Sequence, residues 1–508
     1  MDMKTLTTTA PSSSVLFDGF DERPVDMDFV LPDYDPDIAA VLKCQLTPLV
    51  QSQQINGDQV LVDGMATMRV MYLDEARRCV RSCEFSQPFS SSFTVANMVP
   101  GACVQVTTKT DYVNCRATSS RRLDVHGAFS VKLRVTAAGG QEILQDAQGD
   151  GIQKRALNLV CSVPAASADK SFTINEVVEL GSGKPPAEAL IRGEAVPVLT
   201  DCKQMLNKVV LKGCLYLRHL YASDAENGGM EQTEHEIPFS QIVDVEGLQD
   251  DWQCDVEVEV ASCEVQITAD PGGAGTLLSV SVKLTAHIRC IRSEEVQALT
   301  DAYSTRCPLR VDTQPLETEQ LVGLHRGTEI IKQTFDLPPD DIAGIVDLWG
   351  DAAVAGERCD PDKAVVDGRL MAYMLTRSAA GEVSYYERPV NITLEYSDHC
   401  DRMVTQLRVV RMQYVVNAQK QVELRVELAV TRRCYRTNQC RAVCSVTADE
   451  GEAFPPEKAA LKIYYASAGE SLWQIAKSCH TSMQQVMDEN DLAADVLEQD
   501  TMLLVPLC

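Results

Sequence analysis

The chain has 508 residues, of which 45% are apolar and 23% charged, and its formal net charge is −27. This length exceeds what one hydrophobic core usually organises, so we expect several domains. A surface this acidic repels phosphate backbones and anionic lipid, which argues against nucleic acid or a polybasic membrane contact as partner. No segment approaches the roughly 18 apolar residues of a membrane span, so no membrane insertion is expected.

The N-terminal residues, 1–30, are expected to form a flexible tail. They begin MDMKTLTTTAPSSSVLFDGFDERPVD, which lacks the basic start and the apolar stretch of a signal peptide. We therefore expect a cytoplasmic protein that is not exported by the usual route.

The nineteen cysteines are odd in number and scattered through strand-like segments such as GCLYLRHLY and HIRCIRS. In a reducing compartment, cysteine behaves as a small buried hydrophobic residue. No C-x-x-C motif occurs, and the closest sets lack histidine at metal-ligand spacing. These sets are Cys79 with Cys83, and Cys434, Cys440 and Cys444. The pattern predicts structural thiols and no metal site.

An alternating apolar segment occurs three times, as VLVDGMATMRVMYL, VVLKGCLYLRHLY and AVVDGRLMAYMLT. Each copy has a glycine near its start, at Gly64, Gly213 and Gly368, which lie 149 and 155 positions apart. A period of this length indicates three domain-sized repeats.

Flanking motifs extend the repeat on both sides. Asp-Ile pairs beginning at Asp37 and Asp341 lie 27 positions before the first and third glycines, in a short helix or an edge strand. Prolines open an extended run downstream in each copy, at Pro88, Pro238 and Pro389.

Two further alternating stretches follow in each copy, and period-two alternation predicts half-buried antiparallel strands. One predicted buried face consists of Val280, Val282, Leu284, Ala286 and Ile288. Hairpin loops are predicted at Asn417–Gln421 and from Ala269, where Gly, Asn and Pro occur. The expected fold is mainly β, with three tandem sandwiches or open barrels.

The expected repeat boundaries are 31–162, 172–310 and 325–447. VPAASADKS, from Val163, and VDTQPLETEQ, from Val311, are expected to link the copies. The acidic, proline-bearing residues 448–461 are a plausible tether to a C-terminal domain.

A repeated catalytic centre would place one reactive residue at equivalent positions in each copy. The seven histidines share no such position, and no phosphate loop, nucleophile elbow or His-Glu-x-x-His motif occurs. The segment ITADPGGAGTLL joins two strands and fits a hairpin better than a phosphate cradle. The acidic pairs Asp250–Asp251 and Asp340–Asp341 are adjacent in sequence, which favours a solvated loop over a glycosidase acid and base. We predict no enzyme, no catalytic residue and no cofactor.

The last segment, residues 462–508, predicts a small βααβ domain. Ser471 with Gln474, and Ser482 with Gln485, have the spacing of capping boxes at two helix starts. Asn490 is a reasonable left-handed stop for the second helix.

YYASAGESLWQIAKSCHTSMQQVMDENDL…LLVP resembles a LysM domain over nearly its whole length. The resemblance implies a shallow groove for N-acetylglucosamine-containing glycans between two loops. The implied groove residues are Gly469, Glu470, Ser471, Leu472, Val496, Leu497, Glu498 and Gln499, with Trp473 beside them. The family's usual Pro-Gly-Gln is replaced here by Glu498-Gln499-Asp500, which adds charge and favours a protein ligand. For Trp473, packing is favoured over ligand stacking because aromatic side chains contribute large burial.

The three repeats followed by this domain resemble clostridial spore-coat morphogenetic proteins with three SPOCS repeats and a C-terminal LysM domain. The resemblance implies a non-enzymatic protein of the mother-cell cytoplasm that is recruited to the forespore surface. The implied partner is the coat's basement-layer ATPase, a stage-IV sporulation protein, to which the LysM domain would dock. A protein that binds peptidoglycan glycan in the wall or cortex is the alternative.

Overall fold

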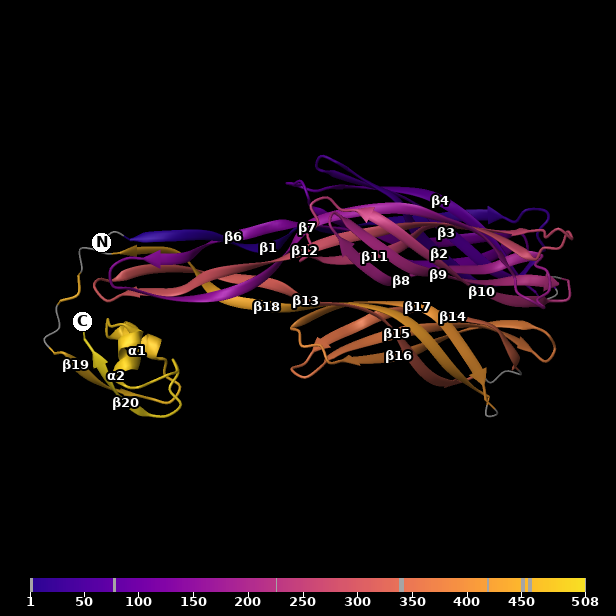
Figure 1. Ribbon diagram of the computed structural model, residues 1–508. Helices are drawn as coiled ribbons and strands as arrows, with labels where there is room; N and C mark the ends of the chain where they lie inside the picture. The colour runs from indigo at the N-terminus through magenta and orange to yellow at the C-terminus, as the bar shows by residue number, and fades with distance from the viewer. Residues whose placement is uncertain are drawn as a thin grey trace.

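The computed structural model describes residues 3–75, 79–224, 226–337, 342–417, 420–448, 453–455 and 459–507. Three consecutive groups of six strands make up most of it (Figure 1). The first group is β1 (Lys4–Val30), β2 (Ile38–Asn56), β3 (Gln59–Asp74), β4 (Val80–Thr94), β5 (Cys103–Ser119) and β6 (Arg122–Gln148). The second is β7 (Ile152–Glu179), β8 (Ala189–Met205), β9 (Lys208–Asp224), β10 (Gly229–Asp244), β11 (Gln253–Thr268) and β12 (Leu277–Ser304). The third is β13 (Leu309–Asp336), β14 (Ile342–Cys359), β15 (Ala364–Ser378), β16 (Val383–Tyr396), β17 (Arg402–Val416) and β18 (Gln421–Ala448).

Each group forms two three-stranded antiparallel sheets with the same strand order. In the first repeat, β2-β3-β4 faces β1-β6-β5, and the other repeats follow with β8-β9-β10 and β7-β12-β11, then β14-β15-β16 and β13-β18-β17. Residues from both sheets of a repeat share one apolar core. The mainly β prediction is confirmed, and each repeat is a sandwich.

The predicted alternation is confirmed on the central strand β12. Val280, Val282, Leu284, Ala286 and Ile288 are all at most 1% exposed. The residues between them are half-buried, as expected for a strand with one face on the core.

The repeated glycine lies beneath a side chain of the neighbouring strand. A Cβ added at Gly64 would lie 2.3 Å from the Phe89 ring, and one at Gly213 would lie 2.3 Å from the Phe239 ring. Each phenylalanine directly follows one of the repeated prolines. In the third repeat, Ile392 is opposite Gly368 and the fit is looser. The motif therefore marks a site of close approach in the sandwich core.

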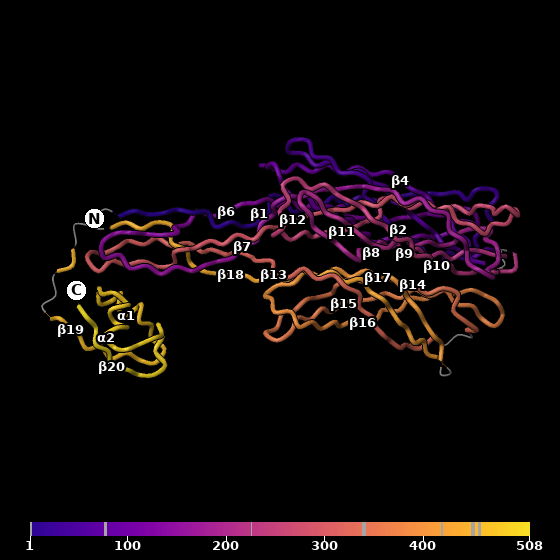
Figure 2. Tube along the Cα trace, viewed as in Figure 1, coloured from indigo at the N-terminus to yellow at the C-terminus, as the bar shows by residue number. Residues whose placement is uncertain are grey.

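The long strands continue past the sandwiches as three two-stranded ribbons. Residues 4–15 pair with 136–148, 152–164 with 291–304, and 309–321 with 435–448. We call these three ribbons the stalk. It extends to the left of the sandwiches in Figure 1, and Figure 2 shows both chain ends near its free end.

The stalk has its own narrow core, built from equivalent positions of the three ribbons. Two such sets are Ile143, Ala298 and Ala442, and Leu144, Leu299 and Val443. At the sandwich end, Met71, Leu220 and Leu375 form a matching set in a cluster that joins all three repeats. The repeats thus pack around a pseudo-threefold axis.

The stalk corrects three sequence-based expectations. Residues 4–30 form β1 rather than a flexible tail, and the expected linkers from Val163 and Val311 lie inside β7 and β13. A narrow ribbon buries few side chains, so these strands are rich in Thr, Ser, Ala and charged residues that resemble a linker. The first Asp-Ile segment is an edge strand, since Ile38 begins β2, whereas Asp340 and Asp341 lie outside the described residues.

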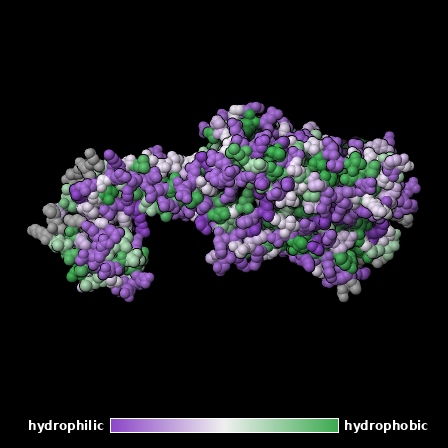
Figure 3. Space-filling model, in the orientation of Figure 1, coloured by the Kyte–Doolittle hydropathy of each residue, from purple (hydrophilic) through white to green (hydrophobic). Residues whose placement is uncertain are grey.

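The C-terminal domain has the predicted βααβ order, with β19 (Leu461–Ala466), α1 (Leu472–Ser478), α2 (Met483–Glu489) and β20 (Thr501–Pro506). Among the described helices, none is long and apolar enough to cross a membrane. The face seen in Figure 3 is largely hydrophilic, with scattered apolar residues.

Two details of helix capping differ from the prediction. Asp495 caps α1, accepting the Trp473 N–H at 3.0 Å and the Ser471 hydroxyl at 2.8 Å. Asn490 has φ −113°, and its side chain instead bonds Val486 and Leu504, tying α2 to β20. The Ser482–Gln485 capping box is confirmed.

Candidate functional site

The two predicted groove loops of the C-terminal domain are joined along their backbones. The Gly469 N–H donates to the Leu497 carbonyl at 2.7 Å, and the Leu497 N–H donates to the Glu470 carbonyl at 3.1 Å. Ser471 and Val496 form an isolated β-bridge. The structure therefore brings both loops into one continuous face, which we call the loop face (residues 469–472 and 496–499).

The predicted groove residues divide by exposure. Gly469, Val496, Glu498 and Gln499 are exposed, and Glu470 and Ser471 are half-buried. Leu472 and Leu497 are at most 6% exposed and belong to the small core of the domain. Leu472 and Leu497 are therefore not available to a partner without unfolding, and ligand binding by any of these residues remains a prediction.

The carboxylates in the loop face and next to it have different structural roles. Glu470 accepts hydrogen bonds from the Ser467 N–H at 2.9 Å and from the Tyr464 hydroxyl at 2.8 Å. The bond to the hydroxyl raises the pKa of Tyr464. Asp500 accepts the Ala468 N–H at 2.8 Å. These two carboxylates fix the loops, whereas Glu498 projects as an exposed charge.

Trp473 directly follows the first loop and docks the domain onto the stalk. Its ring packs edge-to-face on Tyr303 of β12, with centroids 4.9 Å apart, and its indole N–H donates to Asp301 at 2.8 Å. Lys477 donates to the same carboxylate at 2.7 Å, and the Tyr303 hydroxyl donates to the Thr481 carbonyl at 2.8 Å. Trp473 is thus a packing residue, but its aromatic partner, Tyr303, belongs to the second repeat and not to the LysM domain.

Further contacts fix the orientation of the domain. Arg155 of β7 forms a 3.0 Å ion pair with Asp495, the residue that caps α1. Phe454, from the tether, donates its N–H to the Arg306 carbonyl and stacks its ring on His480 at 3.7 Å. The α1 side of the domain is therefore occupied by the stalk, and the exposed loop residues are not.

Titratable groups in the repeats serve packing. Arg192 is fully buried, and although burial lowers its pKa, the nearby carboxylates of Asp347 and Glu194 raise it on balance. Asp347 also pairs with Arg218 at 2.9 Å, so this cluster joins the second and third repeats. Asp250 and Asp251 are exposed in a turn, as predicted.

The cysteines agree with the expectation of structural thiols. All eighteen cysteines within the described residues are free, and Cys263 alone among these is exposed. The ITADPGGAGTLL segment is the predicted hairpin, in which Asp270 accepts the N–H groups of Gly272 and Ala274.

Comparison with protein families assigns the parts of the chain. The family described as SipL, SPOCS domain, matches residues 37–118 and 186–268, and the LysM domain family matches residues 464–506. The chain carries SPOCS domains and a LysM domain. No curated protein and no solved structure matches it.

The two SPOCS matches cover β2–β5 of the first repeat and β8–β11 of the second. The third repeat has the same strand order, from β14 to β17. SPOCS and LysM are non-catalytic families, and together they fit a sporulation-related protein.

Proposed function

We propose that this protein is a non-enzymatic scaffold of spore-coat assembly and forespore encasement. It acts in the mother-cell cytoplasm, is recruited to the forespore surface, and docks through its LysM domain to the coat's basement-layer ATPase. The observation that carries this proposal is the orientation of the LysM domain, whose α1 side is fixed to the stalk while the exposed loop residues stay free.

A fixed loop face suits a protein partner. Holding a docking surface in one orientation lowers the entropy lost on binding. The exposed face pairs an apolar side chain, Val496 at 52% exposure, with the charge of Glu498. An apolar contact bordered by a charge is the usual anatomy of a protein interface.

Peptidoglycan is the second candidate ligand, because the domain matches the LysM family. The loops retain the close approach expected of a glycan groove, and Gly469 keeps a left-handed backbone with φ +86°. Trp473 is not available for sugar stacking, because Tyr303 covers it.

Binding of the full-length protein to the purified coat ATPase and to insoluble peptidoglycan tests the proposal. We expect capture by the ATPase, at least about tenfold weakened by Glu498→Lys, a loss of about 1.4 kcal/mol. Glu489→Lys makes the same charge change on an exposed residue of α2 and is the matched control. Retention on peptidoglycan without capture by the ATPase would reject docking. Charges at Leu472 or Leu497 would unfold the domain and are unsuitable probes.

A further inference from the structure

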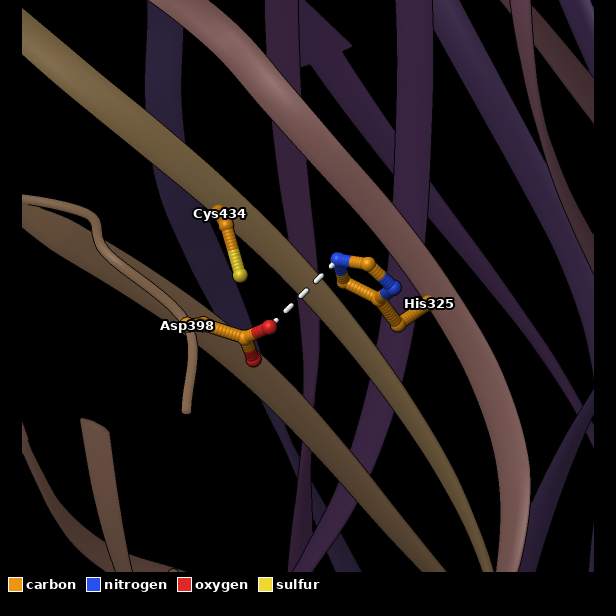
Figure 4. A group of neighbouring side chains, drawn as sticks. All are labelled: His325, Asp398 and Cys434. Carbon is orange, nitrogen blue, oxygen red and sulfur yellow. Dashed lines mark ion pairs between the residues drawn. The ribbon is translucent and has the colours of Figure 1, made fainter. Parts of the chain in front are cut away.

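The third repeat contains a cluster of metal-ligand side chains where its sandwich meets the stalk. His325 comes from β13, Cys434 from β18 and Asp398 from the connection between β16 and β17. One ligand atom from each lies within 4.8 Å of the other two, and Figure 4 shows the three side chains converging on one point.

The spacing of two of these atoms fits a shared cation better than a direct bond. His325 Nε2 and Asp398 Oδ1 are 3.6 Å apart, which is longer than a hydrogen bond. Two ligands of a tetrahedral zinc ion, each about 2.0–2.2 Å from it, lie roughly 3.4 Å apart. The second oxygen of Asp398 is held by Arg432, which orients the carboxylate as the outer partners of metal ligands do.

A second thiol lies next to Cys434. The Cys400 thiol hydrogen-bonds the Cys434 thiol, and the Cys359 sulfur lies 3.5 Å from that of Cys400. Cys400 and Cys434 are both buried, whereas His325 is exposed. A metal here would have the Cys434 sulfur on its inner side and the nitrogen and oxygen ligands toward solvent.

We propose that His325, Asp398 and Cys434 bind a zinc ion. One imidazole, one carboxylate and one thiolate form a ligand set that suits zinc. The ion would join β13, β18 and the β16–β17 connection at the base of the stalk.

The site is specific to the third repeat. Cys434 is equivalent to Cys290 in β12, but the strand register places Ala168 at the position of His325. No sequence motif indicates the cluster, because its three residues are separated by 73 and 36 positions. Folding alone brings them together.

Zinc titration of the full-length, chelator-stripped protein tests the proposal. In His325→Ala we expect the affinity for zinc at this site to fall at least about tenfold. At limiting zinc, wild type should therefore bind one more equivalent than the variant. Cobalt should give a thiolate charge-transfer band that Cys434→Ser removes. Cys290→Ser is the control at the equivalent position and should leave the extra equivalent intact.

His325→Ala alters an exposed side chain, so a loss of binding is separable from unfolding, which circular dichroism of the metal-free proteins checks. The proposal is overturned if wild type and His325→Ala bind the same number of zinc ions with the same affinity. It is also overturned if cobalt bound at the extra site has no thiolate band.

Discussion

The first and second ribbons of the stalk carry an aspartate at the same position but use it differently. Asp146 and Asp301 each accept the next residue's N–H at 2.9 Å. Asp146 also binds Lys154 of β7 within the stalk, whereas Asp301 also binds Trp473 and Lys477 of the LysM domain. One structural device thus stabilises the scaffold in one repeat and attaches the C-terminal domain in the next.

Aromatic packing accompanies this difference. Tyr303, which covers Trp473, is replaced by Gln148 in the first ribbon and by Thr447 in the third. Three near-equivalent ribbons therefore offer a single docking position. A pseudo-threefold scaffold thus acquires a single attachment site for the LysM domain through very few side chains.

The largest expected effect concerns the glycines that the repeats share. In Gly213→Ala the new Cβ would lie 2.3 Å from the Phe239 ring and 2.5 Å from the Val198 carbonyl oxygen. We expect a loss of about 3 kcal/mol in unfolding free energy. Gly368→Ala meets the flexible Leu407 side chain at 3.0 Å and should cost about 1 kcal/mol. Chemical denaturation measures both, and equal losses would contradict the looser fit of the third repeat.

Tyr303→Gln should convert the second ribbon into a copy of the first and release the LysM domain. The change removes an aromatic pair and a hydrogen bond, together about 2 kcal/mol. In a Trp252→Phe, Trp349→Phe background, emission from Trp473 should shift to the red as its ring meets water. Tyr112→Gln, at a 52% exposed tyrosine, is the control. An unchanged spectrum would mean that Tyr303 does not hold the domain.

His219 gives the second repeat a pH dependence that the others lack, since Val70 and Met374 occupy the equivalent positions. Burial, with the nearby His235, Arg192 and Arg69 charges, lowers the pKa of His219 to about 3. Because the unfolded chain takes up this proton near pH 6.5 and the folded one does not, stability falls as pH drops from 6.5 toward 3. The loss is about 1.4 kcal/mol per pH unit.

His219→Met should remove this contribution. Denaturation midpoints of wild type and variant, compared at pH 7.5 and 5.5, measure it. Wild type should lose about 1.4 kcal/mol more than the variant over that interval. Equal losses of unfolding free energy in wild type and variant would show that His219 is already protonated in the folded protein.

The smallest effect is expected at the paired aspartates. Asp301→Asn weakens two bonds to the partly exposed Lys477 and should loosen LysM docking by about 1 kcal/mol. Asp146→Asn should leave Trp473 emission unchanged. A shift of the same size in both variants would mean that the two ribbons are not functionally distinct.

Periodicity explains which parts of this fold were predictable. The sandwich strands follow a regular apolar spacing and the LysM helices have recognisable starts, so the buried face Val280–Ile288 and the βααβ order were predicted correctly. The flexible tail predicted for residues 1–30 was wrong for residues 4–30, which form β1, and its stalk part, residues 4–15, was hard to recognise because a narrow ribbon needs few large apolar side chains. The local spacing of apolar residues predicts a strand with one face on a core. It does not predict a strand in a narrow ribbon, which has few buried side chains.

The arrangement of the LysM domain could not have been predicted in this way. Trp473 and Asp301 are 172 positions apart, and Asp301 looks like Asp146 in sequence. The charged Glu498 was visible in the sequence, whereas the burial of Leu472 and Leu497 beside it needed the structure. Contacts between distant segments depend on how the repeats pack, which no local pattern encodes.

The most direct test measures binding of the coat ATPase to two full-length variants, one altered in the loop face and one at the contact between the LysM domain and the stalk. Val496→Glu changes the exposed loop face, and Tyr303→Gln changes the stalk contact. The account predicts that Val496→Glu loses at least about tenfold in affinity, or 1.4 kcal/mol, while Tyr303→Gln keeps the contact surface and loses less. Full binding by Val496→Glu, with loss in Tyr303→Gln, would contradict it and place the partner on the stalk side.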